Sequence, residues 1–189
     1  AIAYKSHQEG HQVFLLGDNP AVAEFGTCLS LTEPELIAFC QTEPIDLVFI
    51  GPEVYLVDGL VDRLQAAGIR AFGPSAKAAQ LEGSKVFSKQ MMAKYQIPTA
   101  KHESFSDYEA AKQYLAQQAS PIVLKADGLA AGKGVIIAQT QEEAQEALKA
   151  MMQEAKFAEA GGSVVIEEFL EGEEFSLMCF VSDRKVVPM

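Results

Sequence analysis

The sequence predicts an α/β protein in which a parallel sheet covered by helices precedes a second α/β region. Short apolar runs rich in β-branched and aromatic residues alternate with helical patterns over the first 73 residues. The same kind of alternation resumes after Ile97-Pro98. The chain has 189 residues and is 49% hydrophobic, which is enough to bury a sizeable core, yet no apolar run reaches the roughly 18 residues of a membrane span.

Strands and helices alternate over the first 73 residues. The strands are short and apolar, as buried parallel strands tend to be, and a capping box of Thr32 and Glu35 opens the first complete helix. The expected strands are 12–16 (QVFLL), 46–50 (DLVFI) and 70–73 (RAFG), and the expected helices are 34–41 and 57–67. This order is typical of βαβ units with parallel strands. Because the first segment enters in mid-helix, we expect residues to precede Ala1.

Residues 74–95 consist mostly of helix formers with a break at Gly83, which predicts two short helices. Ile97-Pro98 then forces an extended segment, so we place the seam between domains in 74–98. Beyond it, Ser106 with Glu109 and Thr140 with Glu143 form two more capping boxes. The expected strands are 100–105, 121–126, 134–140, 163–170, 173–181 and 185–188, and the expected helices run from 106 to about 118 and from 140 to about 156.

A glycine-rich loop, KADGLAAGKGV at 125–135, is the main candidate for chemistry. A Walker loop would continue from Lys133 with Ser or Thr and then a helix, whereas here Gly134 and the apolar run VIIA follow. A Rossmann loop must also enter a helix. We therefore expect a lid between two antiparallel strands, in which glycines let backbone N–H groups approach phosphate. An ordinary hairpin turn is the alternative, and the loop's length and lysines favour phosphate binding.

Charge and composition exclude several classes of function. The net charge of −11 argues against nonspecific binding of nucleic acid or anionic membrane. The three cysteines show no CxxC spacing, which indicates a structural, reduced role. His7 and His11 have i,i+4 spacing but lack the HExxH pattern, so we do not predict a metal site there.

Two further features are compatible with a nucleotide. Lys85 follows Gly83-Ser84 at a helix start, although such a lysine is more often a solvated surface residue. The stretch VVIEEFLEGEEFS at 164–176 interrupts apolar strands with carboxylates. Its glutamates form either a solvated face or a site whose backbone pairs with an adenine edge and whose carboxylates accept from ribose hydroxyls.

Three segments together resemble the ATP-grasp superfamily and, within it, the glycinamide ribonucleotide synthetase family: GPSAKAAQLEGSKVFSKQMMAKYQIPTA, PIVLKADGLAAGKGVIIA and VVIEEFLEGEEFSL. The resemblance runs from about Asp46 to Met189 and less sharply from Ala1. It implies an amino-terminal parallel-sheet domain (pre-ATP-grasp, Rossmann-like) followed by part of an ATP-grasp domain. The implied divisions are an incomplete substrate domain at 1–73, a helical connection at 74–98, a small ATP-grasp lobe with the glycine lid at 99–160 and an incomplete start of the second lobe at 161–189.

The resemblance also implies roles for individual residues. Lys85 and Lys125 would contact ATP phosphates, Lys125 also the adenine, and the loop from Gly128 to Gly134 would fold over the β- and γ-phosphates. The Glu167 carbonyl and the Leu170 N–H would pair with the adenine, Phe169 would line its slot, and Glu174 would bind the ribose. The implied ATP site is Lys85, Lys125, Gly128, Leu129, Gly132, Lys133, Gly134, Glu167, Glu168, Phe169, Leu170 and Glu174, and the implied site for 5-phosphoribosylamine is Gly51, Pro52 and Glu53. No catalytic residue is assigned.

The implied activity is an ATP-dependent ligase of purine biosynthesis that joins glycine to 5-phosphoribosylamine. The resemblance further implies Mg²⁺ or Mn²⁺, with ligands beyond residue 189 and none in this chain. The expected partners are these small molecules, with no nucleic acid and no membrane, and the expected protein is a cytoplasmic monomer. Two alternatives stay open: another ATP-grasp carboxylate–amine ligase or biotin-dependent carboxylase, and an ATP-binding module without catalysis.

Overall fold

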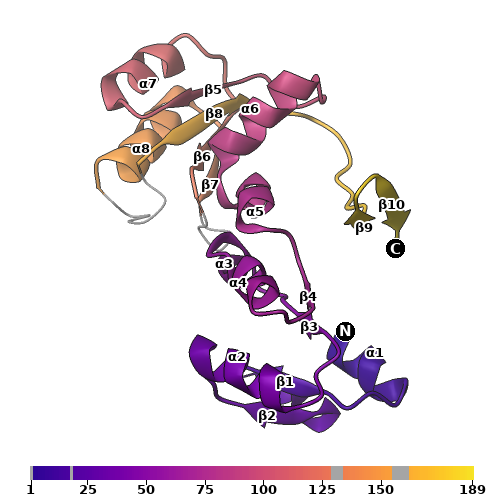
Figure 1. Cartoon of the computed structure of the whole chain (residues 1–189). Helices are drawn as coiled ribbons and strands as arrows, with labels where there is room; N and C mark the ends of the chain where they lie inside the picture. Colours follow the sequence, from indigo (N-terminus) through magenta and orange to yellow (C-terminus); the bar gives the residue numbers. More distant parts are fainter. Residues whose placement is uncertain (1, 18, 129–133, 155–161) are drawn as a thin grey trace. The chain divides into compact units, whose positions relative to one another are not determined.

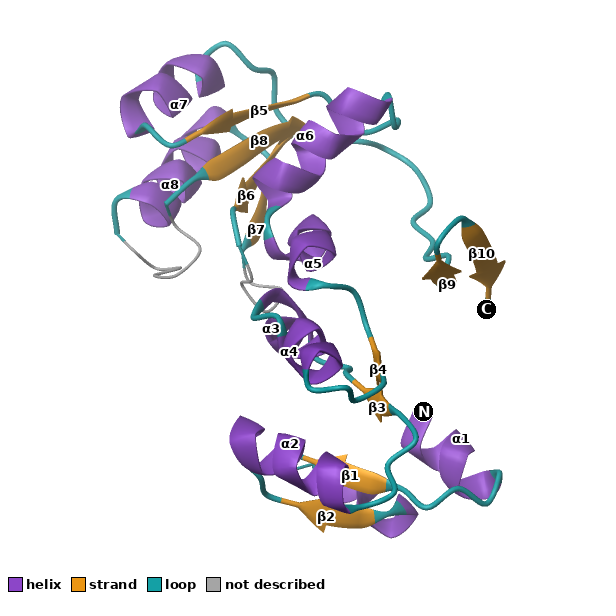
Figure 2. Cartoon of the chain, in the orientation of Figure 1, coloured by secondary structure: helices purple, strands orange, loops and turns teal. Residues whose placement is uncertain are grey.

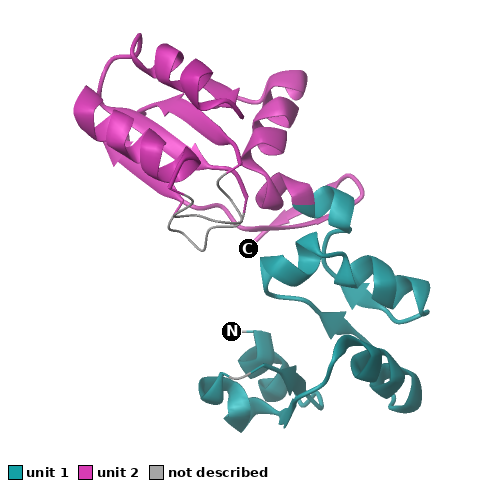
Figure 3. Ribbon diagram, turned by 90° about the vertical axis from the view of Figure 1, so that its left-hand side faces the viewer, with its two compact units in different colours: residues 1–79 teal, residues 80–189 magenta. Residues whose placement is uncertain are grey.

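The computed structural model describes residues 2–17, 19–128, 134–154 and 162–189, with helices and strands alternating along the chain (Figures 1 and 2). The chain divides into two compact units, residues 1–79 and residues 80–189 (Figure 3). The boundary between the units falls inside the segment 74–98, the range that the sequence predicts for the seam between domains.

Unit 1 contains two pairs of parallel strands with helices between them. β1 pairs with β2, with Phe14 opposite Thr27, and β3 pairs with β4, with Val48 opposite Ala71. The predicted parallel α/β organisation is therefore confirmed. The elements are α1 (Ile2–Gln8), β1 (Phe14–Leu16), the 3-10 helix η1 (Pro20–Phe25), β2 (Thr27–Leu29), α2 (Glu33–Thr42), β3 (Val48–Phe49), α3 (Glu53–Val57), α4 (Leu60–Ala66) and β4 (Ala71–Phe72), and α5 (Ala76–Gly83) leads into unit 2.

Local signals explain where the helices of unit 1 begin and end. The capping box is present, because the Thr32 N–H donates to Glu35 Oε2 at 2.7 Å. The helix expected over 57–67 is α4, which begins only at Leu60, because Gly59 takes a left-handed φ of 85° and separates it from α3, which ends at Val57. β2 and η1 were not predicted. The core of this unit is formed by Leu36, Ile50, Leu60, Val61, Leu64 and Ile69.

Unit 2 is built on a four-stranded antiparallel sheet in the order β5-β8-β6-β7. β8 pairs with β5 and β6, so residues on both sides of the expected division at 160/161 belong to one sheet. β9 and β10 form a separate antiparallel hairpin. The elements are α6 (Lys85–Tyr95), β5 (His102–Phe105), α7 (Tyr108–Leu115), β6 (Ile122–Ala126), β7 (Val135–Ala138), α8 (Gln141–Met152), β8 (Val164–Glu168), β9 (Cys179–Ser182) and β10 (Lys185–Pro188).

The two faces of this sheet differ in chemistry. Alternate residues of β6, namely Ile122, Leu124 and Ala126, are buried against α7 and α8, which lie on the same face (Figure 1). The residues between them, Val123 and Lys125, point to the opposite face because side chains alternate along a strand. α6 packs on that second face, with contacts to β8. The second face therefore carries charged groups that the apolar core face excludes.

Several predicted boundaries in unit 2 are wrong by a few residues. The N-cap of α7 is Asp107 instead of Ser106, because the Asp107 carboxylate accepts from the Ala110 N–H at 2.8 Å. The break at Gly83 between α5 and α6 and the Thr140 cap of α8 are confirmed. The strand expected over 173–181 begins only at Cys179. An alternating pattern does not make a strand without a neighbour, and among the described residues β9 pairs with β10 alone.

Over the described residues, no helix has the length and apolar character needed to cross a membrane.

Leu124→Ala should destabilise unit 2. Leu124 is completely buried in β6, and a truncated core leucine costs about 2–5 kcal/mol in the free energy of unfolding. Ile137→Ala is the matched control. Ile137 on β7 is 49% exposed, so this variant should lose much less of the free energy of unfolding. Urea denaturation followed by circular dichroism measures both variants, and equal losses would contradict the assignment of the core face.

Unit 1 should lose stability in acid through Glu33. The Arg63 guanidinium donates to the Glu33 carboxylate, at 2.8 Å between Nη2 and Oε2, and this bond lowers the pKa of Glu33 from its usual value of 4.5. A lowered pKa means that the stabilisation is present above the unfolded-state pKa and disappears as pH falls through the folded-state value. Glu33→Gln should therefore be less stable than wild type at neutral pH, by a small margin because the pair is partly exposed, and equal to wild type in strong acid. Thermal unfolding between pH 7 and pH 2 measures the difference, and a constant gap at every pH would refute this role.

Candidate functional site

Three charged side chains from three elements meet on the second face of the sheet in unit 2. Lys125 Nζ on β6 lies 3.0 Å from Glu167 Oε2 on β8, and Lys89 Nζ on α6 lies 3.2 Å from the same oxygen. Lys89 also donates to Thr99 Oγ1 at 2.7 Å. We call Lys89, Lys125 and Glu167 the charged triad. Its geometry satisfies the rule that buried charges need partners.

The members of the charged triad differ in their access to solvent. Glu167 and Lys89 are buried, at 4% and 7% exposed, whereas the side chain of Lys125 is 30% exposed. Glu167 Oε1 is buried as well and has no hydrogen-bond partner among the described residues. The triad is therefore a largely buried group of ions in which only the Lys125 side chain is partly accessible to solvent.

The stem of the glycine loop is bound to the amino end of α6. Lys85 Nζ donates to the Gly128 carbonyl at 2.8 Å. The Asp127 carboxylate accepts from Ser84 Oγ and from the Val86 N–H, each at 3.2 Å. A carboxylate suits this position because the first N–H groups of a helix are unpaired and carry partial positive charge. These bonds place Lys85 beside the point where β6 runs into the loop.

The prediction that the loop joins two antiparallel strands is confirmed. β6 and β7 pair with Lys125 opposite Val135, and the Ala126 N–H donates to the Gly134 carbonyl at 2.8 Å. Gly128 has a φ of 98°, a conformation that other residues rarely adopt. Gly134 is buried. The predicted site residues Leu129, Gly132 and Lys133 lie outside the described residues.

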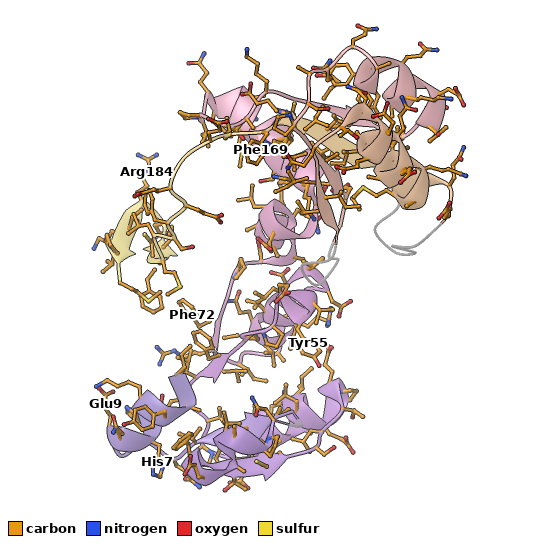
Figure 4. The ribbon with its side chains drawn as sticks, turned by 180° about the vertical axis from the view of Figure 1, so that it is seen from behind. His7, Glu9, Tyr55, Phe72, Phe169 and Arg184 are labelled. Carbon is orange, nitrogen blue, oxygen red and sulfur yellow. The ribbon has the colours of Figure 1, made fainter. Side chains whose placement is uncertain are left out.

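The acidic stretch after β8 lies at the other end of β6. Glu168 pairs with Ile122 in the strand register, and its Oε1 accepts from the Lys101 N–H at 2.8 Å. The next two residues are accessible: Phe169, labelled in Figure 4, is 37% exposed, and Leu170 is 63% exposed. Glu174 is exposed in a stretch without regular secondary structure. Unit 2 thus brings Lys85, Lys125, Gly128, Gly134 and Glu167 to one region and sets Glu168 to Leu170 further along the same sheet.

The predicted site Gly51, Pro52 and Glu53 lies in unit 1 at the carboxyl end of β3, and all three residues are exposed. Glu53 is the first residue of α3, which also carries the exposed Tyr55 (Figure 4). A cavity of about 310 Å³ lies instead at the amino ends of β3 and β4. It is lined by Cys40, Gln41, Ile45, Asp46, Ala67, Gly68, Ile69 and Arg70. Burial raises the pKa of the Cys40 thiol, which leaves it a poor nucleophile.

Sequence reasoning missed Lys89 and Asp127. Lys89 stands four residues after Lys85 on a predicted helix, so the two share a helix face, and this spacing was an available signal. Asp127 lies inside the quoted loop motif, but its contact with the start of α6 spans 43 residues of sequence and leaves no local trace.

Within the described ranges, no group of three or more His, Cys, Asp or Glu side chains is arranged to hold a metal ion.

Two family profiles together match the whole chain. One, described as "Phosphoribosylglycinamide synthetase, N domain", matches residues 1–82, and "Phosphoribosylglycinamide synthetase, ATP-grasp (A) domain" matches residues 83–189. The boundary between them lies close to the boundary between the two compact units.

Individual relatives agree with the profiles. The chain is 48% identical over 193 residues to a phosphoribosylamine–glycine ligase of Halalkalibacterium halodurans, covering 100% of this chain and 45% of the relative. It is 58% identical over 154 residues to the ligase of the same name from Listeria monocytogenes, covering 82% of this chain and 37% of that protein. The chain thus spans less than half the length of these curated relatives.

Solved structures support the fold. The crystal structure of phosphoribosylamine–glycine ligase from Thermotoga maritima superposes with a TM-score of 0.86 at 32% identity, over 99% of this chain and 45% of that one. The biotin carboxylase domain of 2-oxoglutarate carboxylase from Hydrogenobacter thermophilus reaches a TM-score of 0.71 at 19% identity, over 90% of this chain and 42% of that one, which is a likeness of fold alone. From profiles, relatives and fold together, the chain belongs to the phosphoribosylglycinamide synthetase family.

Proposed function

We propose that the protein is an ATP-dependent ligase that joins glycine to 5-phosphoribosylamine in purine biosynthesis. ATP phosphorylates the glycine carboxylate, the amine of 5-phosphoribosylamine attacks the glycyl phosphate, and phosphate leaves as the amide of glycinamide ribonucleotide forms. Family membership supports this reaction, and the relatives from Halalkalibacterium halodurans and Listeria monocytogenes are both named phosphoribosylamine–glycine ligase.

The observation that carries the proposal is the pair of lysines at the stem of the glycine loop. Lys85 comes from α6 and donates to the Gly128 carbonyl at 2.8 Å, while Lys125 is the next-to-last residue of β6, three residues before Gly128, and its side chain is partly exposed. Two ammonium groups beside a loop that needs glycine are suited to the phosphates of a nucleotide.

The register of the sheet supports an extended nucleotide along its second face. The segment that begins at Glu168 lies beside Ile122, and the loop leaves β6 after Ala126. Four residues of strand separate these points by about 13 Å, which is comparable to the length of an extended nucleotide. We infer that the base lies near Glu167 to Leu170, with Phe169 along its slot and Glu174 on the ribose, and that the phosphates lie at Lys85, Lys125 and the loop from Gly128 to Gly134.

In phosphoryl transfer, Lys85 and Lys125 would position the phosphates and supply positive charge. Phosphoryl transfer needs fixed cations near the developing negative charge and little covalent help, and both lysines supply such charge. We assign no general base. ATP-grasp enzymes use a divalent ion, here Mg²⁺ or Mn²⁺, but the described residues lack a ligand cluster for it, so no step is assigned to the ion.

The remaining parts of the proposal concern the second substrate and the setting. We infer that Gly51, Pro52 and Glu53 contact 5-phosphoribosylamine, because ligands of parallel sheets bind at the carboxyl ends of strands and this turn follows β3. We also infer a cytoplasmic monomer whose partners are small molecules. The net charge of −11 supports the absence of nucleic acid and anionic membrane from that set.

The reaction itself is tested by turnover. The full chain of the protein, given ATP, a divalent ion, glycine and 5-phosphoribosylamine, should form glycinamide ribonucleotide and phosphate in equal amounts. In the control, the free amino acid alanine replaces glycine as the carboxylate substrate, and little product should form. A preference for another carboxylate would favour a different ATP-grasp ligase, and ATP binding without amide formation would favour a nucleotide-binding module.

Lys125→Met should weaken ATP binding while the fold persists. A charged hydrogen bond contributes about 1.5–3 kcal/mol, so the dissociation constant should rise roughly ten-fold or more. Lys77→Met, on an exposed position of α5, removes the same charge elsewhere and should bind ATP as wild type does. Calorimetric titration measures both affinities, and an unchanged affinity in Lys125→Met would refute the role of this lysine.

A further inference from the structure

The charged triad has an excess of positive charge. Glu167 Oε2 forms ion pairs with both lysines, Lys89 at 3.2 Å and Lys125 at 3.0 Å, so two ammonium groups share one carboxylate. One net positive charge remains. Lys89 and Glu167 are almost fully buried, and only Lys125 has a partly exposed side chain, so the excess charge is presented where Lys125 reaches the surface.

A single lysine would neutralise Glu167, and Lys125 alone is close enough to do so. In that case the Lys125 ammonium would be compensated by its own ion pair and would attract an external anion only weakly. Lys89 changes this balance, because it offsets the negative charge of the same carboxylate oxygen. Charges removed from water interact more strongly than exposed ones, so this compensation is felt at Lys125.

Lys89 makes two polar contacts through its ammonium group. It donates to Thr99 Oγ1 at 2.7 Å and reaches Glu167 from α6, the same helix whose first residue is Lys85. We propose that Lys89 is a positioning residue that keeps the Lys125 end of the charged triad electropositive and thereby sets the affinity for the phosphates of the nucleotide. This inference rests on the proposed function, since it concerns the same site.

The test is a charge cycle on the full chain, with two probes. Inorganic tripolyphosphate reports on the phosphates alone, because it has no base or sugar, and ATP reports on the whole site. Three variants change the net charge of the triad, which is +1 in wild type. Lys89→Met brings it to zero and Glu167→Gln brings it to +2. The double variant restores +1. Affinity is measured by calorimetric titration, and circular dichroism checks the fold.

We expect affinity for tripolyphosphate to follow the net charge of the triad. Lys89→Met should bind roughly three- to ten-fold more weakly than wild type, Glu167→Gln should bind more tightly, and the double variant should return close to wild type. A purely structural role for Lys89 does not produce this order, because the double variant loses two buried polar contacts and would then be the weakest.

Three controls separate charge from packing. Thr99→Val removes the second contact of Lys89 without changing any charge and should leave the affinity for tripolyphosphate within about two-fold. Lys89→Arg keeps the charge and should retain most of the affinity. Lys77→Met lowers the total charge of the chain by the same amount, far from Glu167 in sequence, and should have no effect.

The inference is overturned if Lys89→Met binds tripolyphosphate as wild type does, or if the double variant binds no better than Lys89→Met. If Lys89→Met does not fold, Glu167→Gln is compared with the double variant instead. In the Glu167→Gln background, the loss of Lys89 must still weaken the binding of tripolyphosphate. A wild-type chain that binds neither probe contradicts the proposed function and this inference with it. Wild-type binding together with an unaffected Lys89→Met rejects this inference alone.

Discussion

The buried carboxylate of Glu167 constrains how β6, β8 and α6 are arranged in unit 2. A buried carboxylate is costly unless it is paired, and its partners come from β6 and from α6. Those two partners fix how α6 lies on the sheet. Because Lys85 begins the same helix, the position of Lys85 beside the glycine loop follows from the pairing of Lys89 further along it.

The alternation of β6 and β8 makes this arrangement compatible with a stable core. Leu124 and Ile166 are opposite each other on the face covered by α7 and α8, while Lys125 and Glu167 follow them in sequence and point the other way. A one-residue shift of either strand would place its own ion, Lys125 of β6 or Glu167 of β8, in the apolar core. The hydrophobic face therefore specifies the geometry of the charged face, without any contact between the two.

Features that depend on a few neighbouring residues could be predicted from the sequence. The Thr32 capping box, the break at Gly83 and the hairpin nature of the glycine loop each rest on local chemistry, and the structure confirms them. Features that depend on distant partners could not be predicted in the same way. The binding of Asp127 to the start of α6 and the late beginning of β9 at Cys179 are set by residues far along the chain or by the presence of a neighbouring strand.

The charge of the protein shows why local and global electrostatics must be separated. A chain with a net charge of −11 repels anions at long range, yet salt at physiological strength screens exposed charges beyond about 8 Å. The electrostatic interaction of a phosphate at close range is then determined by the nearest charged groups and the local dielectric. Burial of Glu167 and Lys89 protects their interaction with Lys125 from that screening. An acidic protein can therefore bind a polyanion through a small buried group in which lysines outnumber carboxylates, and a basic surface is not required.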